Sequence, residues 1–398
     1  MKKVFLFAVS TAMFMVGMAQ NDVQNAAPQA VKPKAANEKD NPRNPANYFT
    51  VDKSIAATSV KDQAMTGTCW CFSTTSLVES QCLKNNWGEY DLSEMYSVRN
   101  IYIEKAKNYI LRQGHAQFGE GGLGHDLIRA IATYGAVPES VYSGLKAGQT
   151  QHNHVKLSAN LKKYVDSVMA IHPLPENWLT GYTNILDTTL GTPPEKFTYN
   201  GKSYTPQTFA EEALHFNAND YVNITSFTHH GYYQPFILEV PDNFSNGAYY
   251  NVPLADMIQL TKDALNKGYS VLWDADVSND GFQQRLGAAV NLGAASDVMV
   301  SKMNVLTGDV KEAKSDAATR QALFENLTTQ DDHLMHITGI EKAKNGNTYF
   351  LVKNSWGDVG PAHGYINVSE SYFAINTISL VVPKAALSKA LLEKLKLK

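Results

Sequence analysis

The sequence predicts an α+β fold, with a helix early in the chain and antiparallel strands near its C-terminal end. Residues 69–82 follow a loop of small residues and have the pattern of a helix. Residues 333–340 and 348–354 are two apolar runs on either side of a short polar stretch with a glycine, which is typical of a β-hairpin. The chain has 398 residues, 44% of them apolar, and this length allows about two to three domains of ordinary size.

The formal net charge of −3 is small for a chain of 398 residues, so neither acidic nor basic residues dominate. A nucleic acid or an acidic membrane surface is therefore not indicated as a partner.

The N-terminus has the pattern of a secretory signal peptide. Two lysines precede an apolar run at residues 4–16, and Gly17-Met18-Ala19 supplies small residues for cleavage after Ala19. The run is shorter than the roughly 20 residues of a membrane span. We therefore expect a signal peptide at residues 1–19, no membrane span, and a mature protein that is periplasmic or extracellular. Residues 20–50, poor in large apolar side chains, are expected to be a flexible leader before a folded domain at 51–398.

Three cysteines, Cys69, Cys71 and Cys82, fall on the predicted helix. Cys69 and Cys71 would point about 200° apart, and Cys71 and Cys82 would lie about 16 Å apart along the axis. A disulfide needs Cα atoms within about 7 Å, so no pair of them can close. Cys69 opens the helix, where the positive end of the dipole stabilises a thiolate, and we predict that it is the reactive thiol. The other two cysteines are expected to pack in the interior.

A reactive thiolate needs a base and a group that orients the base, and His333 and Asn354 are the candidates. His333 begins the first predicted strand and Asn354 ends the second. With a hairpin loop at 342–345 the two residues would lie opposite each other. With a two-residue turn at Asn345-Gly346, Asn354 would face Ile337, about 13 Å from His333. A catalytic pair therefore requires the longer loop or a bulge.

Further histidines are considered as metal ligands, and one glutamine as a donor to an oxyanion. His333 and His336 would point to opposite faces of a strand, and His229-His230 is a poor chelating pair by itself. No metal and no cofactor is expected. The side-chain amide of Gln63 is a donor that can face a developing oxyanion together with the Cys69 N–H.

Four motifs, in the same order along the chain, resemble those of papain-like cysteine peptidases. They are Gln63 with Cys69-Trp70, Glu120-Gly121-Gly122, Asp332-His333 with Gly339, and Asn354-Ser355-Trp356-Gly357. The resemblance runs from about residue 55 to residue 383.

Two departures narrow the resemblance. Thr66 stands where papain itself has a disulfide cysteine, and His333 comes 264 residues after Cys69, against about 130–150 in the papain pattern. Both features resemble the bleomycin hydrolase and aminopeptidase C branch, which lacks the disulfide and carries a helical insertion, here at about 142–251.

The resemblance implies a two-lobed fold and a site. A helical lobe would hold the helix from Cys69 and one at about 124–134, and an antiparallel sheet or barrel lobe the strands from Tyr269, His333 and Thr348. Cys69 would attack a peptide carbonyl with His333 as base and Asn354 as its orienting partner. Trp356 would cover the bond between His333 and Asn354, and Gly121 and Gly122 would contact the substrate backbone.

The resemblance implies an aminopeptidase, and two alternatives to it are left open. In the resembled branch a C-terminal tail beyond the last helix meets the free amine of the substrate. Here the sequence predicts a terminal helix at about 385–397 with no further tail, so a more open cleft and an endopeptidase are the alternative to an aminopeptidase. A catalytically silent binding protein of the same fold is the second alternative. The leader is too short for an inhibitory prodomain, and the resemblance implies restraint by a closed hexamer.

Overall fold

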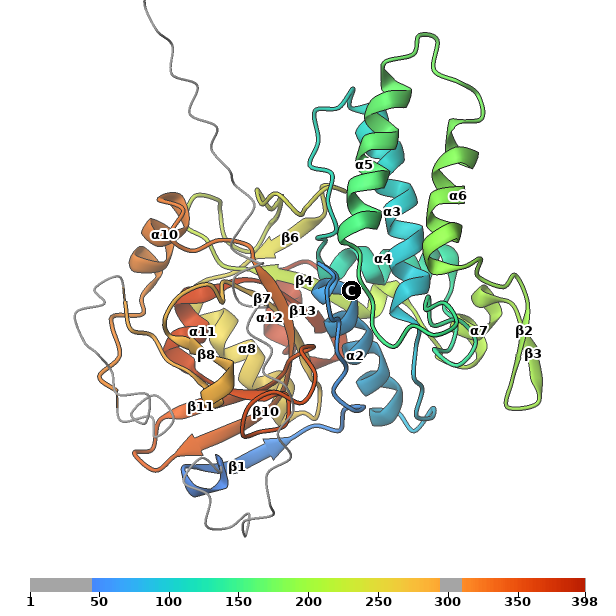
Figure 1. Cartoon of the computed structure of the whole chain (residues 1–398). Helices are drawn as coiled ribbons and strands as arrows, with labels where there is room; N and C mark the ends of the chain where they lie inside the picture. The colour runs from blue at the N-terminus through green and yellow to red at the C-terminus, as the bar shows by residue number, and fades with distance from the viewer. Residues whose placement is uncertain (1–44, 294–309, 398) are drawn as a thin grey trace, which may run out of the picture. The chain divides into compact units, whose positions relative to one another are not determined.

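The computed structural model describes residues 45–293 and 310–397 (Figure 1). The predicted signal peptide, and the leader as far as residue 44, lie outside these residues. A short 3-10 turn, η2 (Pro45–Asn47), is followed by strand β1 (Phe49–Ser54). Phe49 is buried and pairs with β10, so the last residues of the range predicted as leader belong to the sheet.

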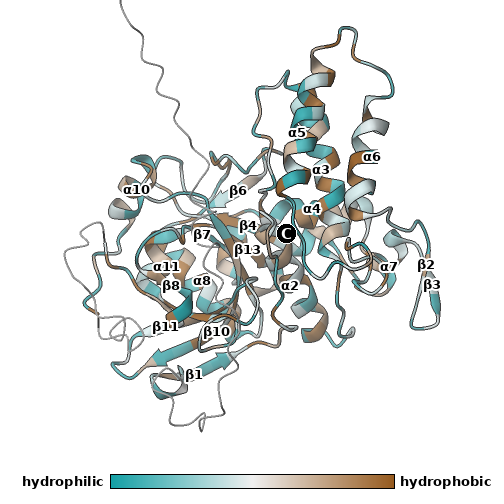
Figure 2. Cartoon of the chain, viewed as in Figure 1, coloured by the Kyte–Doolittle hydropathy of each residue, from teal (hydrophilic) through white to brown (hydrophobic). Residues whose placement is uncertain are grey.

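Helices make up most of the chain from Cys69 to Glu212. They are α2 (Cys69–Lys84), α3 (Glu94–Leu111), α4 (Gly124–Tyr134), α5 (Val155–Met169), α6 (Trp178–Leu190) and α7 (Pro206–Glu212). Leu157, Leu161 and Val165 recur every four residues on α5 and are buried, so one face of this helix packs inward. Helices α3, α5 and α6 pack against one another, and Figure 2 shows apolar and polar residues mixed along each of them. A separate hairpin joins β2 (Phe197–Tyr199) to β3 (Lys202–Tyr204).

The remaining strands form one large mixed sheet. They are β4 (Tyr221–Thr225), β5 (Pro235–Ile237), β6 (Ala248–Asn251), β7 (Val271–Ala275), β8 (Phe282–Gln283), β9 (Ala288–Ala289), β10 (His333–Ala343), β11 (Thr348–Lys353), β12 (Tyr365–Ser369) and β13 (Thr377–Pro383). The order is β5-β6-β4-β13-β7-β10-β11-β12-β9-β8, and β1 pairs with β10. Strands β7, β10 and β11 are antiparallel neighbours, as the family resemblance implies.

Four further helices lie on the sheet side. They are α8 (Leu254–Asn266), α10 (Ala317–Glu325), α11 (Glu370–Asn376) and α12 (Lys389–Lys394), and three short turns are η3 (Ala218–Asp220), η4 (Gln284–Leu286) and η5 (Lys384–Ala386). Helix α8 packs against β1, β7, β10 and β13. Its buried residues share an apolar core with Trp273 and Phe350 of the sheet. None of the helices in the described residues is long and apolar enough to cross a membrane.

Helix α2 joins the helical part to the sheet. It packs against α4 on one side and against β10 and β7 on the other, and nearly all of its residues are buried. Sheet residues Leu272 and Leu334 belong to the same apolar cluster as Cys71 and Leu77 of α2. The N-terminal end of α2 is therefore fixed against the beginning of β10.

The hairpin β10–β11 follows neither of the two predicted registers. His336 pairs with Lys353, a bulge lies between Ile337 and Gly339, and Lys342 pairs with Thr348. A bulge is what the catalytic interpretation required. His333 itself pairs with Ala275 of β7, and Asn354 comes one residue after β11 ends, so the two residues meet by side-chain reach and not as ladder partners.

The predicted insertion and terminal helix differ in detail from the expectation. Residues 142–251 hold α5, α6 and α7, and they also supply β4, β5 and β6 to the main sheet. The predicted helix at 385–397 is shorter, because η5 precedes α12 and the N-cap Ser388 separates them. Leu391 and Leu395 of this C-terminal segment are buried in the core shared with α8.

Candidate active site

Cys69 is the first residue of α2, and its side chain is 7% exposed. Thr68, the N-cap, makes no side-chain hydrogen bond to the first turn. The first N–H groups of a helix have no partner within it, so the N–H groups of Cys69 and Trp70 are donors at the start of α2. Positive partial charge is therefore concentrated beside the sulfur.

The sulfur of Cys69 lies against the beginning of β10. The backbone N–H of Leu334, the residue after His333, hydrogen-bonds to it. Burial raises the pKa of the Cys69 thiol, the Leu334 hydrogen bond lowers it, and the carboxylates of Asp242 and Asp332 raise it further. All three cysteines are free, as the helix geometry predicts, and all three are buried. The Cys71 thiol points to the Glu94 carbonyl oxygen at 3.3 Å.

His333 and Asn354 are joined by a hydrogen bond of 2.7 Å between His333 Nε2 and Asn354 Oδ1. The amide of Asn354 is held at both ends, because its Nδ2 donates to Gln284 Oε1 at 3.0 Å and its Oδ1 also accepts from the Ser355 N–H. An oxygen that faces His333 requires the imidazole proton to be on Nε2. The other ring nitrogen, Nδ1, is then free to accept a proton.

Gln284 is a site residue that the sequence analysis missed. It lies in η4, is 6% exposed, and directs its Nε2 toward the carbonyl oxygens of Val359 and Tyr365. These contacts present its Oε1 to Asn354. No motif surrounds Gln284 in the sequence, and only the return of the chain beside β12 brings it to the site.

The Trp356 ring lies against the imidazole of His333. Its ring centroid lies 4.6 Å from that of His333, with the two planes inclined by 35°. The Gly357 N–H bonds to the Lys61 carbonyl oxygen at 3.0 Å and fixes this segment on the loop before α2. Stacking of this kind keeps water away from the bond between His333 and Asn354.

Gln63 lies between the loop before α2 and the segment after β11. Its Oε1 accepts from Ser355 Oγ at 2.7 Å, and its Nε2 donates one hydrogen to the Thr66 carbonyl oxygen at 2.8 Å. A side-chain amide has two N–H donors, so one remains for an oxyanion.

Gly121 and Gly122 have contacts inside the chain that account for the absence of side chains. A Cβ on Gly121 would lie 1.9 Å from Asp242 Oδ2, and one on Gly122 would lie 3.1 Å from the Trp70 indole. The Trp70 Nε1–H donates to the Glu120 carbonyl oxygen at 3.0 Å, which ties this segment to the start of α2. Contact of these glycines with a substrate stays a prediction.

Burial acts on both members of the predicted nucleophile and base pair. It lowers the pKa of His333 to about 4, against the opposing effect of the Asn354 hydrogen bond. It raises the pKa of the Cys69 thiol. Each charge alone is therefore disfavoured in the site, and a thiolate is stabilised there only together with the imidazolium beside it.

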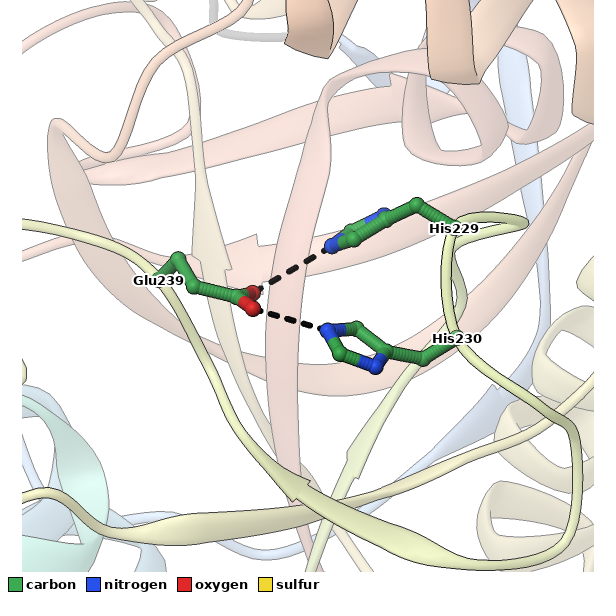
Figure 3. A group of neighbouring side chains, drawn as sticks. All are labelled: His229, His230 and Glu239. Carbon is green, nitrogen blue, oxygen red and sulfur yellow. Dashed lines mark hydrogen bonds and ion pairs between the residues drawn. The ribbon is translucent and has the colours of Figure 1, made fainter.

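The chain also brings His229 and His230 together with Glu239 (Figure 3). His230 Nε2 lies 2.7 Å and His229 Nε2 3.2 Å from the two Glu239 oxygens. Gln321 Oε1 accepts from the Thr228 N–H, so Gln321 Nε2 donates to His229 Nδ1 at 2.9 Å. The proton of neutral His229 is then on Nε2, which makes this atom a donor to Glu239 and not a metal ligand.

Comparisons with known proteins identify the family of the chain. Residues 115–398 match the peptidase C1-like family, and residues 45–167 match the papain family of cysteine proteases. The crystal structure of PepW from Lactobacillus rhamnosis superposes with a TM-score of 0.68 at 20% identity, covering 95% of this chain and 90% of that one. Fold and matches together define a papain-like cysteine peptidase. The chain belongs to the peptidase C1-like family.

Two curated relatives illustrate the branch. Aminopeptidase C of Listeria innocua serovar 6a is 25% identical over 406 residues, which cover 90% of this chain and 88% of the relative. Aminopeptidase G of Lactobacillus delbrueckii subsp. lactis is 23% identical over 378 residues, covering 83% and 82%. The resemblance to the aminopeptidase C branch, drawn from the motifs, is confirmed.

Proposed function

We propose that this cysteine peptidase removes N-terminal residues from peptides through Cys69, His333 and Asn354. The observation that carries the proposal is the hydrogen bond from His333 Nε2 to Asn354 Oδ1, which leaves Nδ1 as the proton acceptor beside the start of α2. The names of the relatives, aminopeptidase C and aminopeptidase G, support the exopeptidase class.

The reaction is acyl transfer. His333 Nδ1 takes the thiol proton, and the Cys69 sulfur attacks the peptide carbonyl carbon and forms a tetrahedral oxyanion. The Cys69 N–H and the second N–H of Gln63 donate to that oxyanion. His333 then gives its proton to the leaving amine, and the acyl-enzyme remains. In the second half His333 removes a proton from water, which attacks the thioester and releases the N-terminal residue.

An open-cleft endopeptidase is less well supported by the contacts. Asp242, from the loop at 238–247 between β5 and β6, lies against Gly121. Its neighbour Phe244 is buried, and Asn108 Nδ2 of α3 points to the Phe244 carbonyl oxygen at 3.4 Å. Side chains of the predicted insertion therefore fill space next to the glycines that the resemblance assigns to the substrate.

The test compares the wild type with Cys69→Ala on an aminoacyl fluorogenic amide and its N-acetylated form. Cleavage of the free-amine substrate alone, lost in the variant, is the expected result. Cleavage of the acetylated form at a similar rate would show an endopeptidase. If neither substrate is cleaved, alkylation of Cys69 by iodoacetamide at neutral pH separates an unsuitable substrate from a silent protein, because only an activated thiolate reacts rapidly.

Export and assembly are further proposals that rest on the sequence alone. Cleavage after Ala19 predicts a mature chain that begins at Gln20, which N-terminal sequencing of the exported protein would test. A closed hexamer predicts a mass six times that of the chain by light scattering, and a monomer would contradict it.

A further inference from the structure

Three carboxyl groups from distant parts of the chain meet beside the nucleophile. Asp242 lies in the loop at 238–247, Asp274 on β7, and Asp331 two residues before His333. The backbone N–H of Asp242 donates to the Asp331 carboxyl, and the Asp331 carboxyl hydrogen-bonds in turn to that of Asp274. The three side chains therefore form one connected group, named here the carboxyl trio.

The carboxyl trio has acceptor capacity that the protein leaves unused. Asp274 is 1% exposed, and its Oδ2 accepts from Ser379 Oγ at 2.9 Å. Its Oδ1 is buried, and within the described residues no amide, hydroxyl or cationic group donates to it. The Asp331 carboxyl is the partner of this buried group, so a ligand does not need to reach Asp274. The acceptor that remains for the N–H groups of a ligand is Asp242 Oδ2, which receives no hydrogen bond from any described residue.

Burial raises the pKa of Asp242, and the positive charge of Lys105 opposes this effect. Lys105 is buried nearby, but its ammonium donates to the carbonyl oxygens of Gly119 and Gly121, and no ion pair joins it to Asp242 within the part of the chain that the structure describes. Gln117 Nε2 donates to Asp242 Oδ1 at 2.9 Å, which leaves Oδ2 over Gly121. The site thus carries an excess of carboxyl groups over cations.

The trio lies next to the position that a scissile bond would take. Asp274 pairs with Leu334, whose N–H contacts the Cys69 sulfur. Asp242 covers Gly121, and the adjacent Gly122 touches Trp70, the residue after Cys69. The Asp242 charge is close enough to raise the pKa of the Cys69 thiol.

The loop that carries Asp242 is held in place by its own side chains. Asn243 Nδ2 donates to the carbonyl oxygens of Leu238 and Gly247, and Asn243 Oδ1 accepts from the Gly247 N–H at 2.7 Å. Phe244 packs under the ammonium of Lys105 at 5.0 Å. The Asp242 carboxyl is therefore placed before any ligand arrives, which is the condition for a preformed site.

We propose that Asp242, with Asp274 and Asp331 behind it, is an ammonium-binding subsite that takes the free α-amino group of the peptide substrate. This inference rests on the proposed peptidase function and names its substrate class, peptides with an unblocked N-terminus. An ammonium supplies three N–H donors and a positive charge, and Asp242 Oδ2 is the acceptor in the trio that no described residue occupies. An N-acetyl group would instead place a carbonyl oxygen against carboxylates, so blocked peptides are excluded.

A protection assay tests the subsite without requiring turnover. Leucinamide, N-acetyl-leucinamide and Nα-acetyl-lysinamide are each titrated against alkylation of Cys69 by iodoacetamide, in the wild type, Asp242→Asn and Asp331→Asn. At Asp242, asparagine preserves the size of the side chain and an oxygen for Gln117. Burial, together with the nearby Asp274, raises the pKa of Asp331 well above its ordinary value, so Asp331→Asn replaces the carboxyl that bonds to Asp274 by an amide of the same size. The matched control is Asp280→Asn, because Asp280 is an exposed aspartate in the loop after β7.

Leucinamide is expected to protect Cys69 of the wild type from alkylation. Asp242→Asn should raise the leucinamide concentration needed for this protection by about 30-fold or more, because a desolvated charge pair loses one of its partners. Asp331→Asn should act in the same direction, and it carries the test if Asp242→Asn does not fold. Unchanged protection in both variants, or an equal change in Asp280→Asn, would overturn the subsite. If Asp242→Asn weakened protection by Nα-acetyl-lysinamide alone, the subsite would bind a side-chain amine, and its assignment to the α-amine would be overturned. If protection depends on Asp242 but the protein cleaves no substrate, the subsite is supported and the proposed peptidase function is contradicted.

Discussion

Replacement of Gln284 by leucine tests whether the orientation of Asn354 controls the imidazole. Gln284 and Asn354 are 6% and 3% exposed, and the bond from Asn354 Nδ2 to Gln284 Oε1 is 3.0 Å long. Leucine has a similar volume and no acceptor, so Asn354 Nδ2 loses its partner in a buried place. Such a loss costs about 1–3 kcal/mol. If the whole cost falls on the geometry in which Asn354 Oδ1 faces His333, kcat falls by about 5- to 150-fold.

The assay measures kcat and KM on the free-amine amide together with the rate at which iodoacetamide alkylates Cys69. We expect Gln284→Leu to lower kcat and the alkylation rate with little change in KM, because Gln284 acts on His333 through Asn354 and is a positioning residue. Gln284→Glu keeps the acceptor oxygen and should retain most of the activity. Gln283→Leu, at the half-buried neighbouring position, is the matched control. If Gln284→Leu and Gln283→Leu behave alike in both readouts, the reasoning is refuted.

Three further predictions concern packing, pH and metal binding. Gly121→Ala should destabilise the protein by about 1–3 kcal/mol in urea unfolding, because the new Cβ would lie 1.9 Å from Asp242 Oδ2. Adding Asp242→Ala should restore part of the lost stability. An unchanged urea midpoint in Gly121→Ala alone would contradict the contact. Burial raises the pKa of Asp332 to about 6 from an ordinary value of 3.8, so the native state holds a proton longer than the unfolded state, and the contribution of Asp332 to stability is lost as pH rises through that window. The free energy of unfolding of Asp332→Asn, relative to that of the wild type, should therefore be higher at pH 7 than at pH 4 by on the order of 2–3 kcal/mol. A difference that does not vary with pH would refute the assignment. Zn²⁺ should leave Tm unchanged, because His229 Nε2 donates to Glu239; a zinc-dependent rise in Tm that Glu239→Gln abolishes would show the opposite.

The motifs of this chain indicate its chemistry because each of them lies within a short stretch of sequence. Cys69 is recognisable since a helix beginning at a cysteine places the thiol at the positive end of the dipole, whatever the rest of the chain does. The exclusion of a disulfide followed from helix geometry alone, and all three thiols are free. The family, and with it the two-lobed arrangement, followed from four such motifs in order.

The hairpin shows where local patterns fail. The apolar runs identified both strands, but the turn residues did not fix the register, because a bulge between Ile337 and Gly339 shifts every pair toward the His333 end. The hydrogen bond between the side chains of His333 and Asn354 still forms, because Asn354 lies past the last ladder pair and its side chain extends back toward His333.

The sequence by itself determined the class of enzyme and predicted its reactive residues, because the predicted nucleophile, base and orienting amide each lie in a short segment whose chemistry is visible without its surroundings. Only the tertiary structure placed Gln284 against Asn354 and brought Asp242 and Asp331 together beside Cys69. Those residues come from segments far apart in the chain and have no motif of their own. Their roles depend on burial and on the unpaired donors and acceptors that packing leaves behind, and these are properties of the folded interior that no local pattern encodes.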